Sequence, residues 1–512
     1  MAHRTPYILV SLICALTLLA GWAWLGRLHP LTDATSAGSR LQCVSYSPFT
    51  RDQSPFDLPL RLDSAQLDTD LALLAQRFSC LRLYSMTGLD AVPELARKHD
   101  IKLILGAWVN TNAHDTELEI RQLVATANKY PDVVTAVLVG NEALLRREIT
   151  APQLVHLIDR VKRQVPQPVS YADVWEFWLR HPEVAPAVDF LTVHLLPYWE
   201  DEPKGIDNAL SEAGRIHADF TRRFAPKTIL IGETGWPSQG RQRETAVPSP
   251  LNQARFIRGF VQQADAEGWR YNLIEAFDQP WKRRSEGTVG GYWGLYDTER
   301  NDKGALSGPV SNLPDWPIWL LVSLLIYGGA LWLAGSRARL WLSPLAAVAA
   351  GCLAYQLQQL EVVSRTPAEW LWAIALVALN GLLLVHAARC ARSMDNQTME
   401  RRAGYLLLAF GFAAAVLMLG LVVDARYRGF PWSALLFPAL FFLMYPHPVR
   451  YREGVLLTGI LLVGVPLQLW QEGLDNHQAL AWAGTCLLLV AALGRGLALE
   501  RPMPCPAVYK TG

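Results

Sequence analysis

Long stretches without charge constrain this chain more than any other feature of its sequence. Residues 7–26 carry no charged side chain and are long enough to cross a bilayer as a helix. Further apolar runs follow residue 316, and the one at 430–445 is short and contains Pro438. They lie at 316–335, 340–360, 370–388, 404–423, 430–445, 454–470 and 479–494.

The segment between these apolar regions has the composition of a soluble domain. We therefore predict four regions, with a cleaved signal peptide as the alternative for the first. They are an N-terminal transmembrane anchor at 1–27, a soluble domain at 28–315, a bundle of about seven transmembrane helices at 316–499 and a cytoplasmic tail at 500–512. None of the seven later runs has an acidic or basic residue in its middle, which argues against a coupled transporter.

The basic residues of the short loops predict the orientation in the membrane. With the N-terminus in the cytoplasm, one side carries Arg4, Arg337, Arg339, Arg389, Arg392, Arg401, Arg402, Arg450, Arg452, Arg495, Arg501 and Lys510. The other side carries only Arg365, Arg426 and Arg428. Basic loops stay in the cytoplasm, so the soluble domain is expected outside the cytoplasmic membrane.

Charge and motifs exclude several classes of protein. The formal net charge is +1, which gives no reason to expect a nucleic-acid partner. The sequence has no GxxxxGK[ST] loop, no HExxH and no paired CxxC. Of the seven cysteines, Cys43 and Cys80 fall in the soluble domain. We expect two small core residues there, with a disulfide as the alternative.

The soluble domain alternates short apolar or β-branched runs with amphipathic stretches. The predicted strands are 41–47, 80–84, 101–108, 134–140, 168–173, 188–194, 228–232 and 271–277. Eight such β/α units in this length predict an α/β fold of the (β/α)8 TIM-barrel type. A doubly wound sheet is the alternative, ranked second because no glycine-rich phosphate motif follows the first strand.

Polar and aromatic residues gather where these strands end, which is where barrel enzymes carry their chemistry. Glu142 and Glu233 follow the fourth and seventh strands, so their carboxylates are expected to face each other across the barrel mouth. Such a pair is typical of a glycosidase, in which one carboxylate attacks the anomeric carbon and the other protonates the leaving oxygen. The predicted catalytic residues are therefore Glu142 and Glu233.

Other strand-end residues are candidates for binding a sugar. They are Tyr84, Asn110, Asn141, His194, Tyr198, Trp236, Asp278, Trp281 and Lys282. For His194 we favour a packed, hydrogen-bonded histidine and keep an acid–base role as the alternative. Asn141 directly precedes one glutamate and is expected to bind a hydroxyl beside the reacting carbon.

The segments VGNEALLR (139–146) and ILIGETGWPS (229–238) resemble the signature segments of family 17 glycoside hydrolases, the β-1,3-glucanase family. The resemblance extends over roughly residues 40–300 and includes IEAFDQPWK (274–282). It implies a (β/α)8 barrel, retention of configuration, Glu142 as acid/base, Glu233 as nucleophile and neither metal nor organic cofactor. Gln279 stands where many members have a glutamate, which puts the preferred linkage in doubt.

Members with a multi-pass membrane tail resemble bacterial β-glucan synthases or transglucosylases. The expected location is thus the bacterial inner membrane, with a periplasmic catalytic domain. We expect a transglycosylase acting on existing β-1,3-glucan, with a plain endo-β-1,3-glucanase close behind. A glucan synthase or export complex is a possible partner in this hypothesis, and a non-catalytic glucan-binding scaffold is the alternative of another class.

Overall fold

The computed structural model describes residues 5–36, 38–57, 59–335, 339–392, 397–424 and 426–500. Contacts divide the chain into two compact units. The barrel unit comprises Leu28–Gly240 and Thr245–Val310, and the helical unit comprises Met1–Arg27, Arg241–Glu244 and Ser311–Gly512. Each unit is described here by itself.

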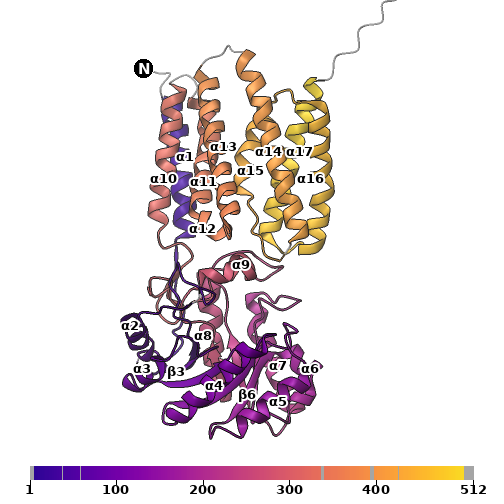
Figure 1. The fold of residues 1–512 in the computed structure, drawn as a ribbon. Helices are drawn as coiled ribbons and strands as arrows, with labels where there is room; N and C mark the ends of the chain where they lie inside the picture. Colours follow the sequence, from indigo (N-terminus) through magenta and orange to yellow (C-terminus); the bar gives the residue numbers. More distant parts are fainter. Residues whose placement is uncertain are drawn as a thin grey trace, which may run out of the picture. The chain divides into compact units, whose positions relative to one another are not determined.

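Eight parallel strands close into a barrel in the barrel unit. Figure 1 shows these strands with helices around them. They are β2 (Leu41–Ser45), β3 (Phe78–Arg82), β4 (Lys102–Ala107), β5 (Val134–Asn141), β6 (Val169–Val174), β7 (Leu191–His194), β8 (Ile229–Thr234) and β9 (Arg270–Leu273). The ring is completed by pairing between β2 and β9. The prediction of a (β/α)8 barrel is confirmed, and closure of the sheet excludes the doubly wound alternative.

Helices follow the strands, and all but the short polar helix at Arg283–Glu286 pack apolar residues on the barrel. They are α2 (Ser64–Ala75), α3 (Val92–Lys98), α4 (Ala113–Lys129), α5 (Ala151–Lys162), α6 (Trp175–Arg180), α7 (Ile206–Arg223), α8 (Pro250–Glu267) and α9 (Arg283–Glu286). Local sequence sets their ends: the Asn112 side chain caps α4, while α8 begins after Ser249 and ends at Gly268 with φ of 69°. Short 3-10 turns lie at Pro182–Val184, Pro280–Lys282 and Gly287–Val289, and β1 (Leu28–His29) pairs with β10 (Val310–Ser311).

The two cysteines of the barrel unit form a disulfide, so the expectation of two separate core residues is wrong. Cys43 on β2 lies directly opposite Cys80 on β3 in the parallel register. Their Cα atoms are 4.3 Å apart, and their sulfur atoms are bonded. The register of the two strands brings the cysteines together, and spacing along the chain does not reveal it.

The helical unit contains the N-terminal helix and the helices after residue 316. They are α1 (Thr5–Leu25), α10 (Trp316–Ala334), α11 (Arg339–Gln358), α12 (Leu360–Val363), α13 (Pro367–Arg392), α14 (Gln397–Val423), α15 (Ser433–Met444), α16 (Tyr451–Glu472) and α17 (His477–Glu500). Among the described residues, six helices are long and apolar enough to cross a membrane, and α15 is a shorter apolar helix. Arg4, Arg337, Arg501, Lys510 and the tail expected after Glu500 lie outside the described residues.

Four residues between β8 and α8, Arg241–Glu244, group with the helical unit. The Arg241 side chain is 1% exposed, forms an ion pair with Glu472 and donates to the Arg428 carbonyl over 2.5 Å. Asn476 donates to the Gln242 carbonyl over 3.0 Å. These contacts make the short segment an integral part of the packing of the helical unit.

Candidate active site

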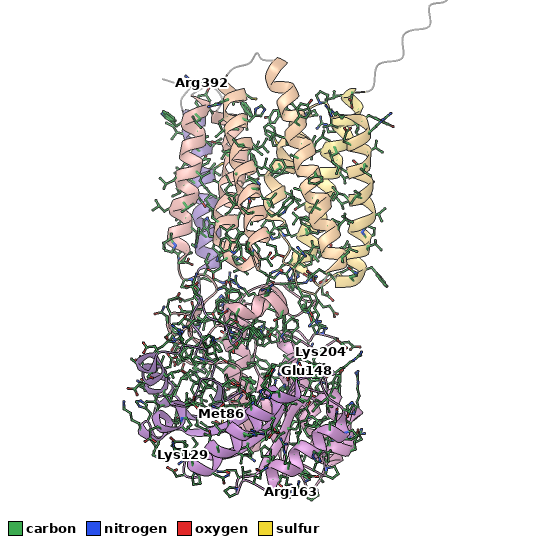
Figure 2. All side chains as sticks on the ribbon, in the orientation of Figure 1. Met86, Lys129, Glu148, Arg163, Lys204 and Arg392 are labelled. Atoms are coloured by element: carbon green, nitrogen blue, oxygen red, sulfur yellow. A yellow bond between two sulfur atoms is a disulfide. The ribbon has the colours of Figure 1, made fainter. Side chains whose placement is uncertain are left out.

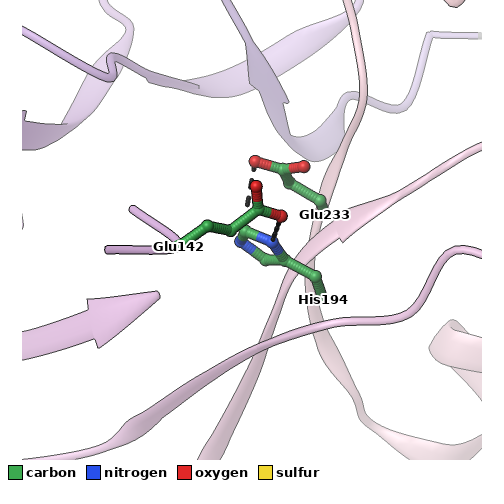
Figure 3. A group of neighbouring side chains, drawn as sticks. All are labelled: Glu142, His194 and Glu233. Atoms are coloured by element: carbon green, nitrogen blue, oxygen red, sulfur yellow. Dashed lines mark hydrogen bonds and ion pairs between the residues drawn. The ribbon is translucent and has the colours of Figure 1, made fainter. Parts of the chain in front are cut away.

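The barrel brings Glu142, His194 and Glu233 together. Glu142 follows β5 directly, His194 ends β7 and Glu233 lies within β8. One ligand-type atom from each of the three side chains, a carboxylate oxygen or an imidazole nitrogen, lies within 4.8 Å of the other two. Figure 3 shows the imidazole beside both carboxylates.

The glycines before the two glutamates are required by the local backbone. Gly140 has φ of 91°, and Glu142 itself has φ of 52°, so the chain turns sharply as it leaves β5. A Cβ atom at Gly232 would lie 2.4 Å from Thr192 Cγ2 and 3.2 Å from His194 Cδ2. The bare backbone of Gly232 therefore lets β8 pack against β7 just where Glu233 enters the site.

Glu233 lies beside a buried cation. Glu233 is 5% exposed, and its Oε1 lies 3.3 Å from Arg82 Nη1. The same guanidinium donates to the Gly232 carbonyl over 2.6 Å and to Asn141 Oδ1 over 2.5 Å. Arg82 thus orients Glu233 and the residue before Glu142 while compensating a buried negative charge.

Arg82 is absent from the residues proposed from the sequence. It is the only charged residue of LRLY (81–84), a strand segment that is otherwise apolar or aromatic. A buried arginine in a barrel strand needs an acidic partner, and that requirement is the signal that points to it.

Glu142 is the more accessible of the two carboxylates, with 23% of its side chain exposed. Its Oε1 lies 2.9 Å from His194 Nδ1. Burial alone would raise the pKa of Glu142, but the hydrogen bond and charge of His194, with Arg146 and Arg82, hold it below its usual range. The two glutamates therefore have different surroundings, one beside a guanidinium and the other beside an imidazole.

Further charged residues follow β9, and of these the sequence predicted Asp278 and Lys282 as candidates but not Glu275 or Glu286. Lys282 Nζ lies 2.8 Å from each carboxylate oxygen of Glu275, a residue that is 1% exposed. Burial raises the pKa of Glu275. Burial also raises the pKa of Glu286 to about 8, and the charges of Glu142 and Glu233 add to this effect. Glu275 and Glu286 therefore add acidic groups near the site, and Lys282 forms an ion pair with Glu275.

Three polar candidates are held by neighbours within the barrel unit. Asp278 accepts from Lys303 Nζ over 2.9 Å and from the Gly294 amide over 2.8 Å. Burial raises its pKa to about 6. Asn110 Oδ1 accepts from the Asn112 amide over 2.7 Å. The Tyr84 hydroxyl lies 2.8 Å from Ser45 Oγ, and its ring lies 4.7 Å from the guanidinium carbon of Arg82.

The aromatic candidates differ in exposure. Tyr198 and Trp236 are completely buried and pack edge to face, with ring centroids 6.1 Å apart. Trp281 is half-buried, and its ring contacts Phe49 and the exposed Phe56 at centroid distances of 6.3 and 5.7 Å. Only Trp281 of these three candidates offers part of an indole or phenol face to a bound sugar.

Two carboxylates and one imidazole also resemble a metal-binding set. Glu233 already faces the Arg82 guanidinium at 3.3 Å, however, and a cation placed among the three side chains would lie close to that positive charge. The arrangement suits proton transfer and attack by a carboxylate better than it suits a metal ion.

Comparisons with known proteins find similarity to glycoside hydrolases. Residues 43–294 match the family model of the BtgE/BtgC glycoside hydrolase domain. A glucan 1,3-beta-glucosidase of Arthroderma benhamiae is 27% identical over 260 residues, which are 47% of this chain and 84% of the relative. A glucan 1,3-beta-glucosidase of Saccharomyces cerevisiae is 25% identical over 268 residues, 48% of this chain and 85% of the relative.

Another relative, from Aspergillus niger, is 29% identical over 303 residues, which span 52% of this chain and only 43% of that longer protein. Among solved structures, the family 17 beta-1,3-glucanosyltransferase of Rhizomucor miehei is similar over 52% of this chain and over 96% of the Rhizomucor miehei chain. It is 22% identical, with a TM-score of 0.46.

Proposed function

We propose that the protein is a retaining transglycosylase that remodels β-1,3-glucan, since residues 43–294 match the family model of the BtgE/BtgC glycoside hydrolase domain. The names of the relatives from Arthroderma benhamiae and Saccharomyces cerevisiae support β-1,3-glucan as the substrate. Glu233 is the nucleophile and Glu142 the acid/base in this proposal. We also propose that four further residues contact the sugar: Tyr84, Asn141, Trp281 and Lys282.

One observation carries the proposal: carboxylate oxygens of Glu142 and Glu233 lie within 4.8 Å of each other. Retaining glycosidases keep their two carboxyl groups about 5–5.5 Å apart, whereas inverting enzymes leave about 6.5–9.5 Å for a water molecule. The short separation favours direct attack by one carboxylate on the sugar.

The surroundings assign the two roles. The Arg82 guanidinium lies 3.3 Å from Glu233 and compensates the negative charge that a carboxylate nucleophile carries. Glu233 attacks the anomeric carbon as the glycosidic bond breaks, and Glu142 gives a proton to the leaving oxygen. Glu142 then removes a proton from water or from a sugar hydroxyl, whose oxygen displaces Glu233 from the anomeric carbon.

Transfer and hydrolysis differ in whether a sugar or water reaches that intermediate first. Half-buried indoles at Trp175, Trp199 and Trp281 support binding of an acceptor sugar, since flat apolar faces stack on pyranose rings. Trp178, Trp236 and Trp293 are at most 2% exposed and do not contribute such faces. Plain endo-β-1,3-glucanase activity is the second candidate.

Glu142→Gln and Glu233→Gln test the proposal on purified full-length protein with laminari-oligosaccharides. Each is expected to lower product formation at least 1,000-fold. The matched control Glu183→Gln, at an exposed side chain, should retain wild-type activity. Longer products would indicate transfer and shorter products alone hydrolysis, whereas no product from the wild type would support the non-catalytic scaffold instead.

The proposed location is a bacterial inner membrane, with the barrel unit in the periplasm. Six long apolar helices support membrane embedding, and the asymmetry of basic loops supports the orientation. The disulfide between Cys43 and Cys80 adds independent support, because disulfides persist in oxidising compartments such as the periplasm.

A further inference from the structure

His194 lies between the two glutamates and contacts both. Its Nδ1 lies 2.9 Å from Glu142 Oε1, and its Nε2 lies 3.5 Å from Glu233 Oε1. The imidazole has no exposed surface. Both ring nitrogens therefore face protein groups, and none of the ring is left to bulk water.

We propose that His194 and Glu142 hold the acid proton of the reaction as a pair, so that His194 is a positioning residue that acts through Glu142. This inference rests on the proposed function and deepens it. It explains how the enzyme keeps a proton available at neutral pH beside a carboxyl group that is poorly suited to retain one alone.

Charged groups lie around the imidazole. Glu142 and Glu233 contact its two ring nitrogens, and Asp173 on β6 interacts with it electrostatically. Among the described residues, the cation in contact with the imidazole is Arg82, whose Nη1 lies 3.5 Å from His194 Nε2. Three carboxyl groups and one guanidinium therefore surround the pair.

The need for such a pair follows from the charge state of Glu142. A general acid must carry a proton before the glycosidic bond breaks. Burial raises the pKa of Glu142, but the hydrogen bond and charge of His194 bring it below the usual range, so this carboxyl group holds the acid proton near pH 7 only together with the imidazole. Imidazole is a stronger base than carboxylate, so the pair releases its proton at a higher pH than glutamate alone.

The proton balance matches the two half-reactions. The pair gives one proton to the leaving oxygen, which leaves His194 neutral and Glu142 ionised while Glu233 forms its bond to the anomeric carbon. When the acceptor hydroxyl attacks that carbon, Glu142 removes its proton, and the pair again holds one. No other reactant is consumed.

The experiment compares the pH dependence of kcat/KM for wild type and His194→Asn with laminari-oligosaccharides. In the variant, kcat/KM is expected to begin falling on the alkaline side of its pH profile (the alkaline limb) at least one pH unit lower than in wild type. The ratio of kcat/KM at pH 7 to kcat/KM at pH 5 should therefore fall about tenfold. The matched control His181→Asn removes a half-buried histidine that also lies beside a glutamate, 3.1 Å from Glu183, and should leave the alkaline limb unchanged.

Two results would overturn the inference without affecting the proposed function. One is an equal loss of kcat/KM at every pH in His194→Asn, as expected from a purely structural role. The other needs only wild-type protein: an alkaline limb near pH 4.3, the ordinary pKa of glutamate, would mean that no pair holds the proton. Full activity in Glu142→Gln would instead refute the proposed function itself.

A substrate whose leaving group needs no proton gives a second readout. With a dinitrophenyl glycoside, His194→Asn is expected to form the glycosyl-enzyme at close to the wild-type rate, because acid assistance is no longer required. A loss as large as that seen with oligosaccharides would contradict the inference, since it would show damage to Glu233 or to sugar binding.

Discussion

At the scale of single residues, buried charges distinguish two otherwise identical glutamates. Arg82 donates to Glu233, the Gly232 carbonyl and Asn141, and so links both strand ends through one planar group. Lysine could not reproduce this fork, because an ammonium group is a compact point charge. The guanidinium therefore supplies orientation as well as charge.

Asp173 gives a pH dependence of stability. Asp173 is completely buried, and burial raises its pKa to about 6. An acid with a raised folded pKa binds its proton more tightly in the folded state, so its contribution to stability is largest below about pH 4 and is lost as pH rises to about 6. Between these pH values the contribution of Asp173 to the free energy of unfolding falls by about 3 kcal/mol.

Asp173→Asn tests this by thermal unfolding of the full chain in detergent. The stability of wild type relative to the variant should fall between pH 4 and 6. The control Asp132→Asn should show the opposite trend at lower pH, because Arg97 holds the pKa of Asp132 at about 2. A difference between wild type and Asp173→Asn that is independent of pH would contradict the prediction.

Sequence reasoning located some residues of this site and missed others. Glu142 and Glu233 could be placed at one end of the barrel because parallel strands fix where their carboxyl ends lie. Arg82, Glu275 and Glu286 could not, because their importance depends on which side chains meet inside the barrel. In the hydropathy pattern Arg82 is only a charged residue inside an apolar strand, and the pattern does not show which carboxylate it contacts.

At the scale of elements, the eight strands were predictable because each is a short apolar run between turns and amphipathic helices. Pairing across strands was not. Cys43 and Cys80 face each other only because Leu41 pairs with Phe78, a register that spacing along the chain does not determine.

Removing the disulfide should destabilise the barrel unit. The closed loop has a sequence separation of 37, for which chain entropy gives about 4 kcal/mol. Cys43→Ala combined with Cys80→Ala should lower the thermal midpoint by about 10 °C. Cys390→Ala, at a free cysteine, is the matched control. If the double variant unfolds at the wild-type temperature, the disulfide makes no contribution.

The ion pair between Arg241 and Glu472 should matter for the helical unit. Glu472→Ala leaves the buried Arg241 cation without its carboxylate, which costs about 3–5 kcal/mol. Glu453→Ala on the same helix is the matched control, because its pair with Arg450 spans 3.6 Å between exposed side chains and should contribute less than about 1 kcal/mol. Equal melting temperatures for both variants would contradict this account.

At the scale of the whole molecule, hydropathy predicted an apolar helical part and a soluble barrel. It did not predict that Arg241–Glu244, far from the other residues of the helical unit in sequence, belong to that unit. A four-residue polar segment has no hydropathy signal, and its membership depends on specific contacts such as the hydrogen bond from Asn476 to Gln242.

The proposed orientation can be tested by cysteine labelling in intact cells. Lys129 and Arg392 are exposed and labelled in Figure 2. In a background with Cys390→Ala and Cys505→Ala, Lys129→Cys should react with a maleimide that cannot cross the inner membrane. Arg392→Cys, at the end of α13, should react only after lysis. The reverse pattern would place the barrel unit in the cytoplasm.

The covalent role of Glu233 is the central claim, and trapping the intermediate tests it most directly. An activated 2-fluoro-glucosyl reagent should leave one fluoroglucosyl group per protein, attached to Glu233 in the peptide identified by mass spectrometry. Attachment should be abolished in Glu233→Gln. A group attached to Glu142, or complete turnover of oligosaccharides with no trapped sugar and inverted products, would contradict the account.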